Sequence, residues 1–65
     1  MTPSEHVGAR IKMYRQKKHL TLGELAKLVN RSPSTLSKYE SGKIIIDINS
    51  IFEIAEALGI NPNQI

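Results

Sequence analysis

The segment SPSTLSKYESGK, residues 32–43, decides the predicted fold because it has the local signals of one short helix. It begins with a serine followed by a proline, a typical helix start, and it contains a glycine where a helix typically ends. Leu36 and Tyr39, three residues apart, provide its apolar face. A helix this short buries little surface. Its polar face, with Lys38 among serines and a threonine, is therefore expected to contact another molecule.

A second short helix is predicted directly before this segment. Thr21 and Glu24 are spaced as in a capping box, in which each side chain binds the backbone N–H of the other residue. The apolar residues that follow predict a helix over residues 22–29. Asn30 tolerates the left-handed conformation that ends a helix, which leaves a turn of about three or four residues before Pro33. Two short helices joined in this way predict a helix-turn-helix.

Further helices are predicted on both sides of this pair. A first helix is expected from Ser4 to Lys17 or Lys18, because residues 2–5 form another capping box and apolar residues then recur at helical spacing. A fourth helix is expected between Asp47, as its cap, and Gly59. Its wide apolar face consists of Ile48, Ile51, Phe52, Ile54, Ala55 and Leu58. A fifth helix is expected to begin at residues 61–62, an asparagine followed by a proline.

The short connections and the absence of paired strands predict a compact all-α domain of five helices over residues 1–65. Residues 44–46 are three consecutive isoleucines, and a strand there would have no partner. We expect a loop that packs partly on the core and partly on a partner chain. All three aromatic residues, Tyr14, Tyr39 and Phe52, are assigned to the core.

The composition excludes several classes of function. The chain has no cysteine, which excludes disulfides and thiolate zinc sites and is compatible with a cytoplasmic location. His6 and His19 lack partners at metal-ligand spacing, and no apolar run is long enough to span a membrane. There is no nucleophile paired with a base and no phosphate-binding glycine loop. An enzyme, a metal and a cofactor are therefore not expected.

The charge of the chain is unevenly distributed. All nine Lys and Arg residues lie within residues 1–43, whereas residues 44–65 contain Asp47, Glu53 and Glu56 and no Lys or Arg. The net charge is +3. A basic region on a small domain indicates an anionic partner, most often nucleic acid.

Together these motifs resemble the Cro/C1-type (XRE) helix-turn-helix family. The resemblance covers Val7 to Ile65 and is carried by VGARIKMYRQKKHLTLGELA (7–26), SPSTLSKYESGK (32–43) and IFEIAEALGI (51–60). It implies a lambda-repressor-like fold and a transcriptional regulator, expected to be a repressor, that binds double-stranded DNA in a sequence-specific manner. The third helix, about residues 33–41, is the recognition helix in this family and enters the major groove.

The resemblance also implies which residues contact DNA. Lys38 is the strongest candidate for base readout, because lysine donates to guanine O6 and N7. The other residues expected to face base edges are Pro33, Ser34, Thr35 and Ser37. Phosphate contacts are expected from the start of the second helix and from side chains near the third: Thr21, Leu22, Lys27, Arg31, Ser41 and Lys43. Arg15 is instead expected to form a structural ion pair with Glu40.

The sequence departs from the family pattern at several positions. Leu22 stands where a glutamine commonly contacts phosphate, which leaves only its backbone amide for that contact. Gly23 weakens a short helix by up to about 1 kcal/mol relative to alanine. Asn30 replaces the turn glycine, and Arg31 replaces a residue that is often apolar. Arg31 is therefore expected to point outward, toward DNA.

A homodimer is expected, because one recognition helix contacts only about four to six base pairs. A two-fold dimer reads both half-sites of an inverted repeat. The expected interface is formed by isoleucines in excess of what a small core buries: Ile44, Ile45, Ile48 and Ile65. Two alternatives stay open. The isoleucines could fill the core, or the domain could be a protein-interaction module, such as an antitoxin or anti-repressor domain, that binds a protein through the fourth helix and residues 44–46.

Overall fold

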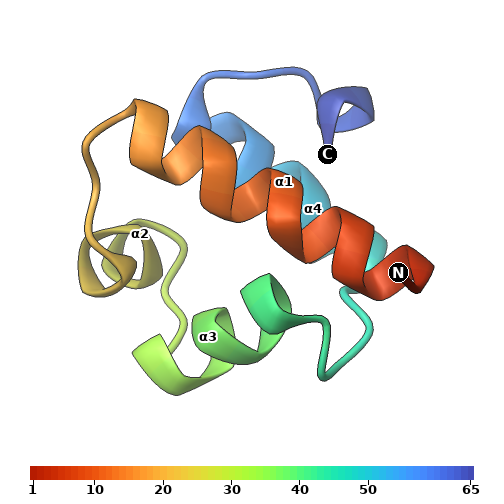
Figure 1. The fold of residues 1–65 in the computed structure, drawn as a ribbon. Helices are drawn as coiled ribbons and strands as arrows, with labels where there is room; N and C mark the ends of the chain where they lie inside the picture. Colours follow the sequence, from red (N-terminus) through yellow and green to blue (C-terminus); the bar gives the residue numbers. More distant parts are fainter.

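The computed structural model describes residues 1–65 and consists of four α-helices followed by one short 3-10 turn. In Figure 1, α1 crosses the molecule with α4 behind it, while α2 and α3 lie below α1. The bounds are α1 (Pro3–Lys17), α2 (Leu22–Leu28), α3 (Pro33–Ser41), α4 (Ile48–Leu58) and the turn η1 (Pro62–Gln64). The predicted all-α fold is confirmed, and the predicted boundaries of the first four helices agree to within one residue.

Side-chain caps explain where the helices begin. The Oγ1 atom of Thr2 accepts a hydrogen bond from the Glu5 N–H at 3.1 Å, and Glu5 Oε1 accepts one from the Thr2 N–H at 2.8 Å. Thr21 and Glu24 form the same capping box at the start of α2. The helices α3 and α4 have single caps from Ser32 and Asp47. Each cap satisfies N–H groups that have no partner within the helix.

One apolar core lies between the four helices. Its central side chains come from every helix and are almost fully excluded from solvent: Ile11, Leu25, Leu36, Ile54 and Leu58. Ala26 is also buried. The polar exception is Ser50, whose hydroxyl donates to Asp47 Oδ1 at 2.7 Å and accepts from Arg31 at 3.0 Å. Ser50 therefore enters the core with its hydrogen bonds satisfied.

The prediction of a fifth helix is wrong. Residues 62–64 form only one 3-10 turn, with Gln64 binding back to the Asn61 N–H at 2.8 Å. The backbone hydrogen bonds run from the Gln64 N–H to the Asn61 carbonyl at 3.0 Å and from the Ile65 N–H to the Pro62 carbonyl at 3.2 Å. Both have the three-residue spacing of a 3-10 helix. The predicted start at residues 61–62 is therefore present, but the hydrogen bonds that follow it are not α-helical.

The assignment of Phe52 to the core is also wrong. Phe52 is 52% exposed, whereas Tyr39 is 6% exposed and Tyr14 is half-buried. The helix α4 has apolar residues around most of its circumference, but only the side of Ile54 and Leu58 faces the other helices. Phe52 lies on another side of the helix. No helix of the structure reaches the length and apolarity needed to cross a membrane.

Candidate nucleic-acid interface

The helices α2 and α3 are joined by a tight turn that fixes their relative orientation. Asn30 has a φ of 56°, the left-handed conformation that asparagine tolerates. The Arg31 N–H donates to the Ala26 carbonyl at 2.9 Å, which closes the C-terminal end of α2. Pro33 then begins α3. The turn and the buried Ala26 bring α2 and α3 together as a helix-turn-helix.

The outer face of α3 carries most of the residues predicted to contact bases. Pro33, Ser34, Ser37 and Lys38 are exposed on this face, opposite the buried Leu36. Thr35 is only half-exposed, because its hydroxyl lies 2.9 Å from Ser32 Oγ within the helix cap. Four of the five predicted side chains thus lie on one accessible face, while the fifth takes part in the cap.

Several of the residues predicted to contact phosphate come from the start of α2 and from the end of α3 and beyond it. Thr21, Ser41 and Lys43 are exposed, but two of their polar groups already have partners. The Thr21 N–H donates to Glu24 within the capping box at 2.8 Å, and the Ser41 hydroxyl donates to the Lys38 carbonyl at 3.3 Å. Leu22 is half-buried and packs against the core, so its side chain is not available.

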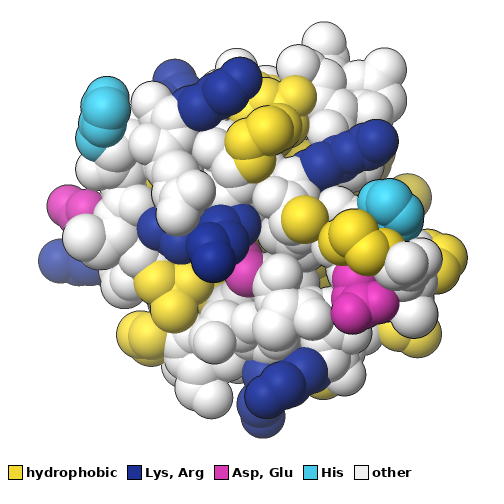
Figure 2. Space-filling view, viewed as in Figure 1, with side chains coloured by type: hydrophobic (Ala, Val, Ile, Leu, Met, Phe, Trp, Pro, Cys, Tyr) yellow, Lys and Arg dark blue, Asp and Glu magenta, His cyan; other side chains and the backbone are white.

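Basic side chains surround this region. In Figure 2, Lys and Arg side chains are more widespread than Asp and Glu, and a group of them lies where α1, α2 and α3 meet. A hollow of about 300 Å³ at this junction is lined by Lys12 together with Ser37 and Ser41 of α3. Nothing in the sequence distinguishes Lys12 from the other basic residues of the first helix. Lys27 is exposed on α2.

The predicted ion pair between the first and third helices is present. Arg15 Nε donates to Glu40 Oε2 at 2.6 Å, and its Nη2 donates to Glu40 Oε1 at 3.0 Å. A third bond runs from Arg15 Nη1 to the Leu20 carbonyl at 2.8 Å. The hydrogen bonds to Glu40 raise the pKa of Arg15 above its ordinary value. Arg15 thus connects α1, the following loop and α3, which is a structural role.

Arg31 does not point outward as the sequence predicted. Its Nη2 binds Glu53 Oε1 at 2.9 Å and Ser50 Oγ at 3.0 Å, and its Nη1 binds the Val29 carbonyl at 2.7 Å. The reason is that α4 offers a hydroxyl and a carboxylate directly beside the turn. A contact between Arg31 and phosphate stays a prediction, and it requires this side chain to leave Glu53.

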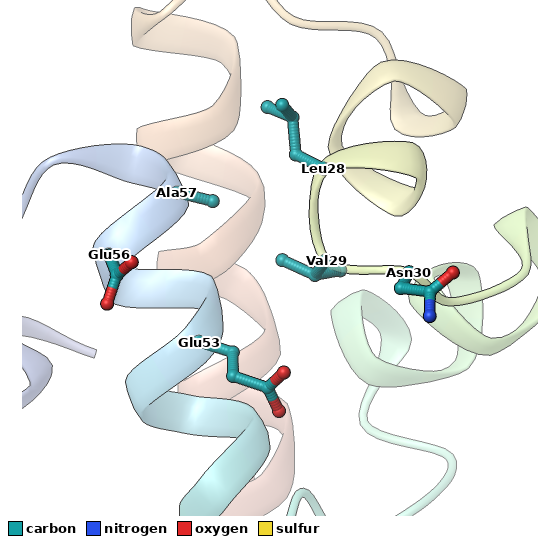
Figure 3. A pocket seen from close by; sticks show the side chains of 6 residues that line it. All are labelled: Leu28, Val29, Asn30, Glu53, Glu56 and Ala57. Atoms are coloured by element: carbon teal, nitrogen blue, oxygen red, sulfur yellow. The ribbon is translucent and has the colours of Figure 1, made fainter.

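Two further surfaces lie outside the helix-turn-helix. At the start of α4, Ile48 and Phe52 are exposed one turn apart, and Ile45 in the preceding loop is 85% exposed. Ile65 instead packs against the core. Between α2 and α4, an open hollow of about 290 Å³ is lined by Leu28 and Ala57, with Glu53 and Glu56 at its edge (Figure 3).

Comparison with known proteins agrees with this arrangement. A family model described as helix-turn-helix matches residues 11–65. The clp gene regulator ClgR from Corynebacterium glutamicum superimposes with a TM-score of 0.94 and 30% identity over 97% of this chain and 67% of that chain. The restriction-modification controller protein C.AhdI from Aeromonas hydrophila gives a TM-score of 0.89 and 28% identity over 92% of this chain and 91% of that chain.

A curated relative adds a match in sequence. Multiprotein-bridging factor 1 from Candida albicans is 39% identical over 54 residues, which are 83% of this chain and 36% of the relative. The chain therefore spans about a third of the length of the curated relatives it matches. The family match, the regulator structures and the helix-turn-helix geometry agree: the chain belongs to the Cro/C1-type (XRE) helix-turn-helix family of DNA-binding transcription regulators.

Proposed function

We propose that this chain reads a specific sequence of double-stranded DNA by placing α3 in the major groove. The observation that carries this proposal is the exposed polar face of α3, which includes Ser34, Ser37 and Lys38, on a helix held against the core by Leu36 and Tyr39. A helix can read base edges only if other elements hold it at a fixed angle to the DNA backbone. We further propose repression as the mode of regulation, because a bound domain blocks access to the DNA it covers.

Within this proposal the side chains have different roles. Lys38 donates to guanine O6 and N7, the strongest direct readout available on this surface. The hydroxyls of Ser34 and Ser37 can donate or accept hydrogen bonds and therefore discriminate less between base pairs. Pro33 offers an apolar contact for a thymine methyl group. Thr35 supports the cap and contributes less to the base contact, because its hydroxyl is already bonded to Ser32.

Phosphate contacts position the domain without reading sequence. We assign them to Lys43 after α3, to Lys27, to the hydroxyls of Thr21 and Ser41, and to the backbone amide of Leu22. Thr21 Oγ1 accepts from the Glu24 N–H and still has its own hydrogen to donate. Since these groups come from two different elements, α2 and the end of α3, they would fix the register of α3 in the groove.

We propose that the domain binds as a homodimer through the start of α4. Ile45, Ile48 and Phe52 support this surface, because all three are large, apolar and at least half exposed. Phe52 is an addition to the residues that the sequence indicated, and Ile44 at 38% exposure lies at the edge. A two-fold dimer would present two copies of α3 to an inverted repeat.

The proposal is tested by selecting binding sites from a random pool of duplex DNA at near-physiological salt. Enrichment of an inverted repeat with half-sites about 10 base pairs apart, or a multiple, supports a dimeric sequence reader. Enrichment of one half-site supports sequence reading by a monomer and contradicts the dimer. Bulk binding that depends on salt, without any enriched sequence, contradicts sequence-specific binding.

A second candidate function is the binding of a protein partner. Leu28 is 61% exposed beside the hollow that Glu53 and Glu56 border, away from the recognition face of α3. The name of the Candida albicans relative, multiprotein-bridging factor, also points to protein partners. DNA binding that is insensitive both to salt and to Lys38→Ala and Lys43→Ala would favour this function over the first.

A further inference from the structure

The helices α1 and α3 approach each other tightly at Gly8. This glycine is buried in the middle of α1, and a Cβ atom built on it would lie 2.2 Å from the Tyr39 carbonyl oxygen and 2.5 Å from the Glu40 carbonyl oxygen. Both oxygens belong to the backbone of α3, so no side-chain rotation relieves the clash. The absence of a side chain at Gly8 therefore sets the distance between the two helices.

Two other contacts hold the same end of α3 against α1. Gly42, which ends α3 with a φ of 74°, lies so close to α1 that a Cβ there would be 2.6 Å from Glu5 Cγ and 2.7 Å from Glu5 Cα. Arg15 binds Glu40 further along α1. Glu5, Gly8 and Arg15 recur at helical spacing and hence lie toward one side of α1. The end of the recognition helix thus rests on α1 at three points.

We propose that Gly8 is a positioning residue for DNA readout. This inference rests on the proposed function. Base contacts come from α3, whereas several of the proposed phosphate contacts come from α2 and from Lys43 beyond the end of α3. Hydrogen-bond readout requires the donor to be placed within about 0.5 Å. Because α3 packs against both α1 and α2, a shift of α3 away from α1 also changes the position of Lys38 relative to the phosphate-binding groups at α2.

A methyl group at position 8 would exceed that tolerance. Contacts of a Cβ under 3.0 Å are essentially never seen, so a Cβ at 2.2 Å from the Tyr39 oxygen must move by at least 0.8 Å. Backbone must shift, and α3 would be displaced or tilted relative to α1. The phosphate contacts of Lys27 and Lys43 tolerate such a shift, because an ammonium group on a flexible side chain can bind any of several oxygens of the DNA backbone. A direct base contact does not, because Lys38 must meet two fixed acceptors on one guanine.

The chain offers a matched control for this substitution. Gly23 also lies within a helix, but a Cβ built on it meets nothing within 4 Å. Alanine is a better helix former than glycine at both positions. Gly8→Ala and Gly23→Ala therefore add the same methyl group, once against the α3 backbone and once in open space.

The test first selects a binding site for the full unmodified chain from random duplex DNA. The dissociation constants of the unmodified chain, Gly8→Ala and Gly23→Ala are then measured on that duplex and on a scrambled duplex of equal composition. For Gly8→Ala we expect the ratio of scrambled to selected dissociation constants to fall about tenfold or more, the effect of losing one direct base contact. Affinity for the scrambled duplex should change less than threefold, and Gly23→Ala should retain the ratio.

Circular dichroism shows whether each variant is folded, and Gly8→Ala is also tested in combination with the stabilising Gly23→Ala. A folded Gly8→Ala variant with an unchanged ratio overturns the proposal. If the variant does not fold even in the combination and with saturating DNA, Gly8 is a folding requirement and the positioning role is likewise rejected. Failure of the unmodified chain to select any site contradicts the proposed function itself, and the two failures are therefore distinguishable.

Discussion

Arg15 and Arg31 each bind a glutamate, but the two ion pairs differ in exposure. The side chains of Arg15 and Glu40 are 11% and 8% exposed, whereas those of Arg31 and Glu53 are 28% and 52% exposed. Breaking a buried pair leaves a charge without compensation, while an exposed pair contributes little because water and salt screen it. Only the first pair should therefore matter strongly for stability.

Arg15→Ala is expected to lower the free energy of unfolding by about 3 kcal/mol, because Glu40 is left buried without its partner. Urea unfolding at pH 7 measures this loss. A double-mutant cycle with Glu40→Ala isolates the coupling between the two side chains. The matched cycle with Arg31→Ala and Glu53→Ala should give a coupling below about 1 kcal/mol. Equal couplings in the two cycles would contradict this view of the Arg15 pair.

Lys38 and Lys43 are expected to respond differently to removal. Lys38→Ala should weaken binding to the selected DNA site by about 1–3 kcal/mol and relax the preference at one base position. Lys43→Ala should weaken binding to all sequences alike and reduce the slope of log affinity against log salt by about 0.9. Fluorescence anisotropy titrations at several salt concentrations measure both effects. A uniform loss of affinity for Lys38→Ala would show that it contacts phosphate instead.

At the scale of the elements, helix starts could be predicted because their cause is local. Thr21 and Glu24 satisfy each other's backbone N–H groups over three residues, and Asp47 accepts a hydrogen bond from the Ser50 N–H over the same spacing. The Arg15–Glu40 pair came from the family resemblance, since nothing local links residues 25 positions apart. Residue type and spacing were sufficient to predict the caps, whereas predicting the ion pair required the family pattern.

Other features depend on packing that the sequence does not display. The direction of Arg31 is decided by Ser50 and Glu53 on α4, which lie 19 and 22 residues away. Phe52 has the same apolar character as its buried neighbours, and only the assembled fold leaves it exposed. Gly8 looks merely unfavourable for a helix when its surroundings are unknown. The need for a glycine at this position becomes visible only in the folded structure, where the backbone of α3 leaves no room for a Cβ atom.

Acid is expected to weaken α1, α2 and α4 through their caps. Hydrogen bonds from the backbone and side chains of Thr2 and Thr21 lower the pKa of Glu5 and Glu24, and the hydroxyl and backbone of Ser50 lower the pKa of Asp47. A carboxylate whose folded pKa is depressed stabilises the fold above its unfolded pKa, and this contribution disappears as the pH falls through the folded value. Stability should therefore decline below about pH 4.

Urea unfolding from pH 7 to pH 2.5 measures this decline. The variant Glu24→Gln keeps the shape of the side chain but cannot titrate, so it should be less stable than the unmodified chain at pH 7 and converge with it at low pH. Glu56→Gln, an exposed change near the end of α4, is the control. A constant difference between Glu24→Gln and the unmodified chain at every pH would contradict the assigned role of the Glu24 charge.

At the scale of the whole molecule, the basic residues and the proposed dimer surface come from different parts of the chain. All Lys and Arg residues lie within residues 1–43. The exposed apolar residues Ile45, Ile48 and Phe52 come after them in the sequence. A basic surface attracts DNA over a distance of about 8 Å at physiological salt. Apolar contact with a second copy would leave that surface free, so DNA binding and dimer formation are compatible in this fold.

Ile48→Gln is expected to weaken the proposed dimer by about tenfold or more, because it removes an apolar side chain from the interface. Sedimentation velocity over a range of protein concentrations measures the dissociation constant. Leu28→Gln is the matched control, since Leu28 is 61% exposed and Ile48 is 68% exposed, and both lie on helices. A monomer at every concentration, with or without the selected DNA, would contradict the homodimer.

The packing of α3 against α1 also has a consequence during protein synthesis. Glu40 follows Arg15 by 25 residues, so α1 emerges from the ribosome before α3 does. At about 5–20 residues per second, this delay lasts about one to five seconds. Throughout that interval Gly8 lacks the α3 backbone that covers it in the folded protein. The speed of translation therefore sets how long α1 is exposed before α3 packs against it.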